Sequence, residues 1–108
     1  MLRQETVSET EVRLVVSGSL YGEAGIELER KLVSLFDSIY STITLDLSKA
    51  LGITSSTIGK LLAAHSHLSD QKRTIRIEGC SEVLYSLFQK IKLDTLIPIN
   101  KMPTEGGA

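Results

Sequence analysis

The strongest constraint on this chain is the way its hydrophobic period switches between two and about 3.6 residues. Residues 11–17 read Glu-Val-Arg-Leu-Val-Val-Ser, where apolar and polar positions alternate as in a strand with one buried face. Residues 42–47 and 73–78 are rich in β-branched and apolar side chains, which predicts two more strands. Strands that alternate with helical segments predict a largely parallel sheet with right-handed crossovers.

Three segments have the helical period and would connect these strands. The first runs from Glu23 to about Ile39, the second starts in a Ser/Thr cluster near residue 54, and the third follows Ser81, a good N-cap residue. Their expected apolar stripes are Leu28, Leu32, Leu35, Phe36 and Ile39 in the first, Ile58, Leu61, Leu62, His65 and Leu68 in the second, and Val83, Leu84, Leu87, Phe88 and Ile91 in the third.

Two weaker extended segments complete the pattern. Residues 5–8 would form an antiparallel hairpin with residues 11–17, and residues 96–99 would form a last strand in which Pro98 has to lie at a sheet edge or a strand end. The predicted order is β-β-α-β-α-β-α-β. This is an α/β fold with a mixed, mostly parallel sheet of four to five strands and about three helices. We expect one domain over residues 1–100 and a flexible, Gly-rich tail over residues 101–108.

Charge and composition exclude several classes of function. The 108 residues contain 12 Lys and Arg against 13 Asp and Glu, so the net charge is -1, and a chain without basic excess is not expected to bind nucleic acid or an anionic membrane. A single cysteine excludes an internal disulfide and a cysteine-based metal cluster. The sequence has neither an apolar run of transmembrane length nor a signal-peptide pattern, and we therefore expect a cytoplasmic protein.

The motifs of common enzymes are missing from the sequence. Residues 52–60 lack the glycine spacing and the Lys-Ser or Lys-Thr pair of a phosphate-binding loop, and no Gly-x-Ser-x-Gly elbow occurs. His65 and His67 are two residues apart on a predicted helix and do not face each other, so a shared metal is not expected. We expect no catalysis, no cofactor and no metal.

One polar segment carries most of the functional information. Thr54, Ser55, Ser56 and Thr57 stand together after the central predicted strand, at the sheet edge where α/β folds usually meet ligands and partners. Helix capping needs only one or two of these hydroxyl groups. The residues alone leave both interpretations, helix cap and contact site, open.

Three short motifs around this segment resemble the STAS domain family, and in particular the bacterial anti-sigma factor antagonists. They are Gly18-Ser19-Leu20, Ile43-Thr44-Leu45-Asp46-Leu47-Ser48 and Ile53-Thr54-Ser55-Ser56-Thr57-Ile58-Gly59. The family motif reads Asp-Ser-Ser-Gly or Asp-Ser-Thr-Gly, with another Gly two residues on. Thr54 replaces the Asp, and Thr57 replaces the first Gly, where its side chain would restrict the close approach of a kinase backbone.

The resemblance implies a switch at the second helix. It places the phosphorylation target on Ser56, with Ser55 as the neighbouring candidate. Asp46 would either hold the following loop by accepting N–H bonds or orient Ser56. The partner-binding residues implied by the resemblance are Thr54, Ser55, Ser56, Thr57, Ile58, Gly59, Ser19 and Asp46.

The same resemblance implies the partners. The unmodified protein would bind an anti-sigma factor of the serine-kinase type and so release a sigma factor, the kinase would phosphorylate Ser56, and a phosphatase would reset the cycle. The chain would be a monomer or a weak dimer. Two alternatives remain: a STAS subunit of a transporter or stress-signalling complex that binds its partner without phosphorylation, and a domain that binds a small ligand or nucleotide at the helix N-terminus.

Overall fold

The computed structural model describes residues 2–101 and has the predicted order of elements. Five strands and three α-helices alternate as expected after an initial hairpin, with one short 3-10 turn near the end. The elements are β1 (Leu2–Thr6), β2 (Glu11–Leu20), α1 (Glu23–Ser34), β3 (Thr42–Ile53), α2 (Ser55–Ser69), β4 (Thr74–Cys80), α3 (Glu82–Lys90), the 3-10 turn η1 (Leu93–Thr95) and β5 (Ile99–Asn100).

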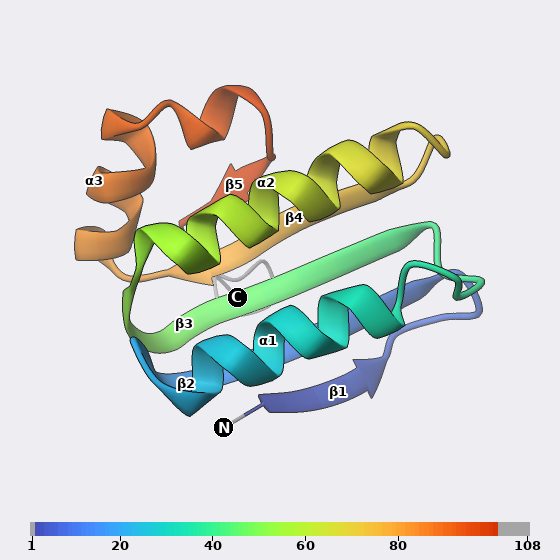
Figure 1. Cartoon of the computed structure of the whole chain (residues 1–108), viewed down its shortest axis with the longest axis horizontal. Coiled ribbons are helices and arrows are strands. Elements are labelled where there is room, and N and C mark those ends of the chain that lie inside the picture. The colour runs from blue at the N-terminus through green and yellow to red at the C-terminus, as the bar shows by residue number, and fades with distance from the viewer. Residues whose placement is uncertain (1, 102–108) are drawn as a thin grey trace, which may run out of the picture.

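The five strands lie side by side in chain order, β1-β2-β3-β4-β5. β1 is antiparallel to β2, as the hairpin prediction required, and all the other pairs are parallel. Right-handed crossovers that all step in the same direction place their helices on the same side of a sheet. Figure 1 shows α1 and α2 lying along one face. No helix within residues 2–101 is long and apolar enough to cross a membrane.

The hydrophobic core fills the space between the sheet and the helices. On β2, Val12, Leu14 and Val16 are buried and alternate along the strand as predicted, and Leu20 is buried at its end. Facing them, α1 contributes Leu28 and Leu32, while the largest buried side chain of α3 is Phe88. The remaining large, fully buried core residues are Ile43, Leu45, Leu47, Leu61, Leu68, Ile75 and Ile77.

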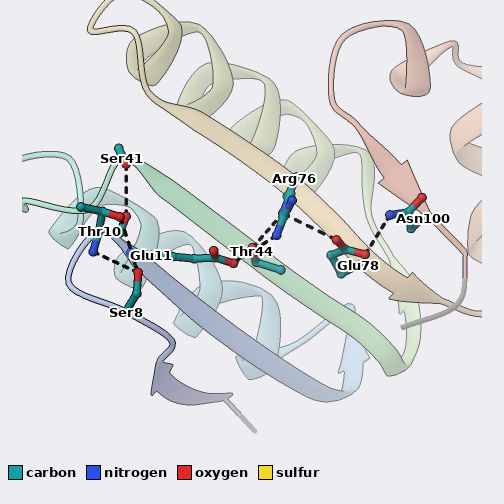
Figure 2. A network of polar contacts seen from close by, with 8 residues as sticks. All are labelled: Ser8, Thr10, Glu11, Ser41, Thr44, Arg76, Glu78 and Asn100. Atoms are coloured by element: carbon teal, nitrogen blue, oxygen red, sulfur yellow. Dashed lines mark hydrogen bonds and ion pairs between the residues drawn. The ribbon is translucent and has the colours of Figure 1, made fainter. Parts of the chain in front are cut away.

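The other face of the sheet carries a chain of polar contacts across three strands and onto β5 (Figure 2). Thr44 of β3 donates to Glu11 of β2 at 3.0 Å and accepts from Arg76 of β4 at 3.1 Å. Arg76 also lies 3.7 Å from Glu78, which accepts a 2.9 Å hydrogen bond from Asn100. Thr44 and Glu78 are buried, and both are hydrogen-bonded within this network.

Two strands are longer than their sequence pattern indicated. We expected β2 to break at Gly18 and residues 49–54 to form a loop; instead β2 and β3 stay paired to Leu20 and Ile53. Gly18 has φ 94, a backbone conformation that glycine adopts without steric cost, and β3 carries two extra residues opposite β2. These bulges absorb the irregular polar pattern, and they leave Leu51 79% exposed.

The first helix is shorter than its apolar stripe. It ends at Ser34 instead of near Ile39, which is 80% exposed. Arg73 explains the early end, because its guanidinium donates to the carbonyl oxygens of Leu35, Phe36 and Tyr40 and so binds groups that a longer helix would use internally. Leu35 and Phe36 still contact the core from the turn that follows the helix.

Three further strands differ from their predicted bounds. β1 spans Leu2–Thr6 instead of residues 5–8; it ends at Thr6 because Val7 and Ser8 belong to the hairpin turn, where both backbone N–H groups donate to the Glu11 carbonyl. β4 extends through Gly79 to Cys80. β5 spans only Ile99–Asn100 at the sheet edge, directly after Pro98, as the missing N–H of proline requires. Of the expected tail, residues 102–108 lie outside the described residues.

Candidate functional site

The start of α2 divides the four hydroxyl residues into two pairs. Thr54 is the N-cap, and its Oγ1 atom accepts the Thr57 backbone N–H at 3.2 Å. The Thr54 hydroxyl also lies 3.2 Å from the Thr57 hydroxyl, to which it donates. Thr54 therefore caps the helix start, as the capping interpretation expected, and its hydroxyl also holds that of Thr57. Ser55 and Ser56 are exposed on the first turn of α2 and are not needed for the cap.

Thr57 points into the protein and not toward a partner. Its side chain is only 2% exposed, and its hydroxyl donates to Glu29 of α1 at 3.5 Å. α1 makes room for it with Gly25, where an added Cβ would lie 3.0 Å from the Thr57 hydroxyl and 2.6 Å from the Leu20 carbonyl oxygen. We expected the Thr57 side chain to restrict a kinase backbone; the structure instead uses it to join α1 to α2.

The surface beside Ser56 is hollowed. A pocket of about 290 Å³ lies between the first turns of α1 and α2, with Ser56, Glu29 and Ile26 among its lining residues. Tyr21, which also lines it, lies across Gly52 of β3 so closely that an added Cβ there would be 2.6 Å from the ring. The pocket is thus bordered by a hydroxyl group, a carboxylate and an aromatic ring that all lie at the carboxyl end of the sheet.

Apolar side chains are exposed in this region: Tyr21 and Ile26 line the pocket with Ser56, and Leu51 lies near the end of β3. Tyr21 is 68% exposed, Ile26 50% and Leu51 79%. The sequence pattern does not single out these three residues or Glu29, because Tyr21 and Leu51 lie in segments without a clear period and because no local pattern distinguishes an outward apolar position on a helix. The signal that could have found Tyr21 is an aromatic residue directly after a strand and near a glycine.

The other expected contact residues are placed as follows. Ser19 is exposed near the end of β2, and its hydroxyl accepts the Tyr21 backbone N–H at 3.2 Å. Ile58 is partly buried against the core. Gly59 faces open space, since an added Cβ would meet no atom within 4 Å. Ser19 therefore lies beside Tyr21, which lines the pocket, and Gly59 leaves the surface of α2 without a side chain about one turn after Ser56.

Asp46 stands apart from this group. It lies in the middle of β3 and not at its end, where its carboxylate accepts from Arg13 at 3.0 Å and from the Ser48 hydroxyl and backbone N–H at 2.6 and 3.0 Å. Of its two possible roles, these contacts are those of a structural acceptor. Burial raises the pKa of Asp46, but the hydrogen bonds from Ser48 and Arg13 outweigh it and hold that pKa below its ordinary value.

The sheet, the one-sided helices and the hydroxyl-bearing start of α2 define a STAS domain. The family model described as "Mlab, STAS domain" matches residues 4–98, and the chain belongs to this family. The resemblance seen in the sequence is thereby confirmed. No curated protein sequence matches the chain significantly.

Solved structures share the fold at low sequence identity. The anti-sigma factor antagonist SpoIIAA in its unphosphorylated form has a TM-score of 0.77 and 19% identity, over 93% of this chain and 88% of that chain. The Bacillus cell fate determinant SpoIIAA in its phosphorylated form has a TM-score of 0.73 and 18% identity, over 93% and 91%. The STAS domain of a SulP transporter from Vibrio cholerae has a TM-score of 0.62 and 16% identity, over 86% and 71%.

Proposed function

We propose that this STAS domain is a non-enzymatic cytoplasmic regulator that binds an anti-sigma factor of the serine-kinase type through the start of α2 and so releases a sigma factor. One observation carries the proposal. Thr54 caps the helix and the buried Thr57 hydroxyl binds Thr54 and Glu29, whereas Ser55 and Ser56 lie on the same turn and are exposed. Hydroxyl groups that the fold does not use are available to a partner.

The surroundings of Ser56 fit a docking surface. Tyr21, Ile26 and Leu51 offer exposed apolar area on the same edge, and aromatic and aliphatic side chains of this kind are typical anchors of protein interfaces. Gly59 leaves space beside them for the backbone of a partner. The surface is neutral at its centre, with the Glu29 carboxylate at one border of the pocket.

Phosphorylation of Ser56 switches the contact. The kinase transfers the γ-phosphoryl group of ATP to the Ser56 Oγ atom, ADP leaves, and the hydroxyl proton is released; a phosphatase later hydrolyses the phosphoserine. The phosphate adds a charge of about -1.5 to -2. It lies on the first turn of α2, where the helix dipole favours an anion, and the fold therefore stays intact. Docking is weakened because the new charge lies on a surface that binds the partner through neutral and apolar groups.

A kinase assay tests the proposal. The protein is incubated with ATP and the serine-kinase anti-sigma factors of its own organism, and phosphate is located by mass spectrometry. We expect the wild type and Ser55→Ala to gain one phosphate and Ser56→Ala to gain none. The Ser55→Ala variant is a matched control, because it removes an exposed hydroxyl from the same turn. Phosphate on neither serine with any of these kinases would refute the switch.

A second candidate is a STAS subunit of a transporter or stress-signalling complex that binds its partner without phosphorylation. The match to a SulP transporter STAS domain and the replacement of the motif's Asp and Gly by Thr54 and Thr57 favour it. A stable complex with a transporter subunit, isolated from the native organism with Ser55 and Ser56 unmodified, would select this candidate over the first.

A further inference from the structure

The third helix presents apolar residues on two neighbouring rows, and only one of them is in the core. Leu84 and Phe88 are buried against the sheet. Val83, Leu87 and Ile91 form the adjacent row at a spacing of four residues, and we had expected this row to be buried too. Instead, Val83 is 75% exposed and Ile91 45%, while Leu87 is partly buried. The outer row is therefore a short apolar stripe on the surface.

A charged row runs beside this stripe. Glu82, Ser86 and Lys90 also follow a spacing of four residues, so the row is negative at its start, neutral in the middle and positive at its end. Both rows border a shallow hollow of about 460 Å³, lined by Glu82, Val83, Ser86, Leu87 and Lys90. Lys101 binds the Glu82 carboxylate at 2.6 Å, yet the Glu82 side chain remains 78% exposed.

We propose that α3 is the contact surface of a homodimer, in which α3 of a second copy packs antiparallel against it. In an antiparallel pair related by a two-fold axis, the same flank of each helix lies on the same side of the interface. Each row of residues then faces the same row of the other copy, running in the opposite direction. Val83 of one copy then contacts Ile91 of the other, Leu87 contacts Leu87, and Glu82 contacts Lys90 on both sides of the axis.

The charges decide both the occupant and its direction. In a parallel two-fold pair the charged rows of the two copies lie on opposite flanks of the interface, so Glu82 and Lys90 of the two copies do not meet. The antiparallel pair makes two attractive contacts and buries the apolar row. Because α3 has only nine residues, its area is small compared with standard interfaces, and the dimer forms at high protein concentration.

Sedimentation equilibrium tests the arrangement with charge-reversed variants. The wild type is expected to exceed the monomer mass of 11.8 kDa as its concentration approaches about 1 mM. Glu82→Lys and Lys90→Glu should each weaken self-association by about tenfold, because every reversal turns two attractive contacts into two repulsive ones. An equal mixture of these two variants should associate again as a heterodimer. Positions 82 and 90 are both positive in Glu82→Lys and both negative in Lys90→Glu, so the two chains attract each other.

Two further variants complete the test. Lys60→Glu makes the same change of charge on α2 and should dimerise like the wild type. Val83→Glu should remain monomeric, and its exposed position keeps the fold intact, which circular dichroism checks for every variant. A wild type that stays at 11.8 kDa at all concentrations, or a mixture that does not associate, would overturn the proposal. Either outcome leaves the function proposed for Ser56 untouched, because none of these variants changes Ser55 or Ser56, the two serines that the kinase assay tests.

Discussion

The two faces of the central sheet solve the problem of burial in different ways, although the same strands supply both. Toward the helices, β3 presents Leu45, which is fully buried in an apolar core. Toward the open side, the preceding residue of the strand is Thr44, which is equally buried but lies between Glu11 and Arg76 in a hydrogen-bonded network. One face is stabilised by removing apolar area from water, and the other by hydrogen bonds and ion pairs among its polar side chains.

This difference separates surfaces whose polar groups are paired within the protein from surfaces that expose apolar side chains. Ion pairs cross the strands of the open face, such as Arg13 with Asp46 and Arg76 with Glu11, so these charges are already paired within the protein. The carboxyl edge around Ser56 and the outer stripe of α3 expose apolar residues instead. Contacts with other proteins are therefore expected at the edge and at α3, and not on the open face. Four predictions test this comparison.

The largest effect is expected on the helix-covered face. Leu45→Ala leaves a cavity in the core and should lower the free energy of unfolding by about 2–5 kcal/mol, measured by urea denaturation. Leu51→Ala is the matched control, since it makes the same change on the same strand at a side chain that is 79% exposed. The control should stay within about 0.5 kcal/mol of the wild type. Equal losses in both variants would contradict the assignment of the core.

A smaller effect is expected from the polar face. Thr44→Val keeps the shape of the side chain but removes its hydrogen bonds to Glu11 and Arg76, which should cost about 1–2 kcal/mol. Thr74→Val, at an exposed position of β4, makes the same change outside the network and serves as control. If Thr44→Val were as stable as the wild type in urea, the network would contribute no net stability.

The pH dependence of stability should reveal Asp46. Its pKa is lowered in the folded state, so its contribution is present above the ordinary pKa of 3.8 and is lost as the pH falls through the folded value. Asp46→Asn should therefore lower the free energy of unfolding by about 1 kcal/mol at pH 7 and make stability less dependent on pH below about 5. Asp37→Asn replaces an exposed carboxylate and serves as control. If the free energy of unfolding of Asp46→Asn followed the same pH dependence as that of the wild type, Asp46 would not stabilise the fold through its carboxylate.

The smallest effect on stability is expected at the partner edge. Ser56→Asp introduces a charge on the first turn of α2, where the dipole favours it, and the free energy of unfolding should stay within about 0.5 kcal/mol of the wild type. Thermal unfolding of this variant and of phosphorylated protein measures the effect. A fall in Tm of several degrees would mean that the switch acts through the fold and not through the interface.

Periodicity predicted the element order, the antiparallel hairpin and the edge position of Pro98 because these depend on neighbours in the sequence. It did not predict the ends of β2 and β3, since the pairing of Ser17–Leu20 with Lys49–Ile53 is a contact between distant segments. It also placed the end of α1 too late, because the residue that binds the helix carbonyls, Arg73, comes much later in the chain.

The candidate site divides in the same way. The sequence by itself determined that a run of hydroxyl residues begins a helix after the central strand, and its order of motifs pointed to the STAS family. Only the tertiary structure decided which hydroxyls are internal: Thr57 turns toward Gly25 and Glu29 of α1, while Ser56 stays exposed. The physical reason is that the spacing of residues sets the face of a helix, but burial depends on the helix packed against it.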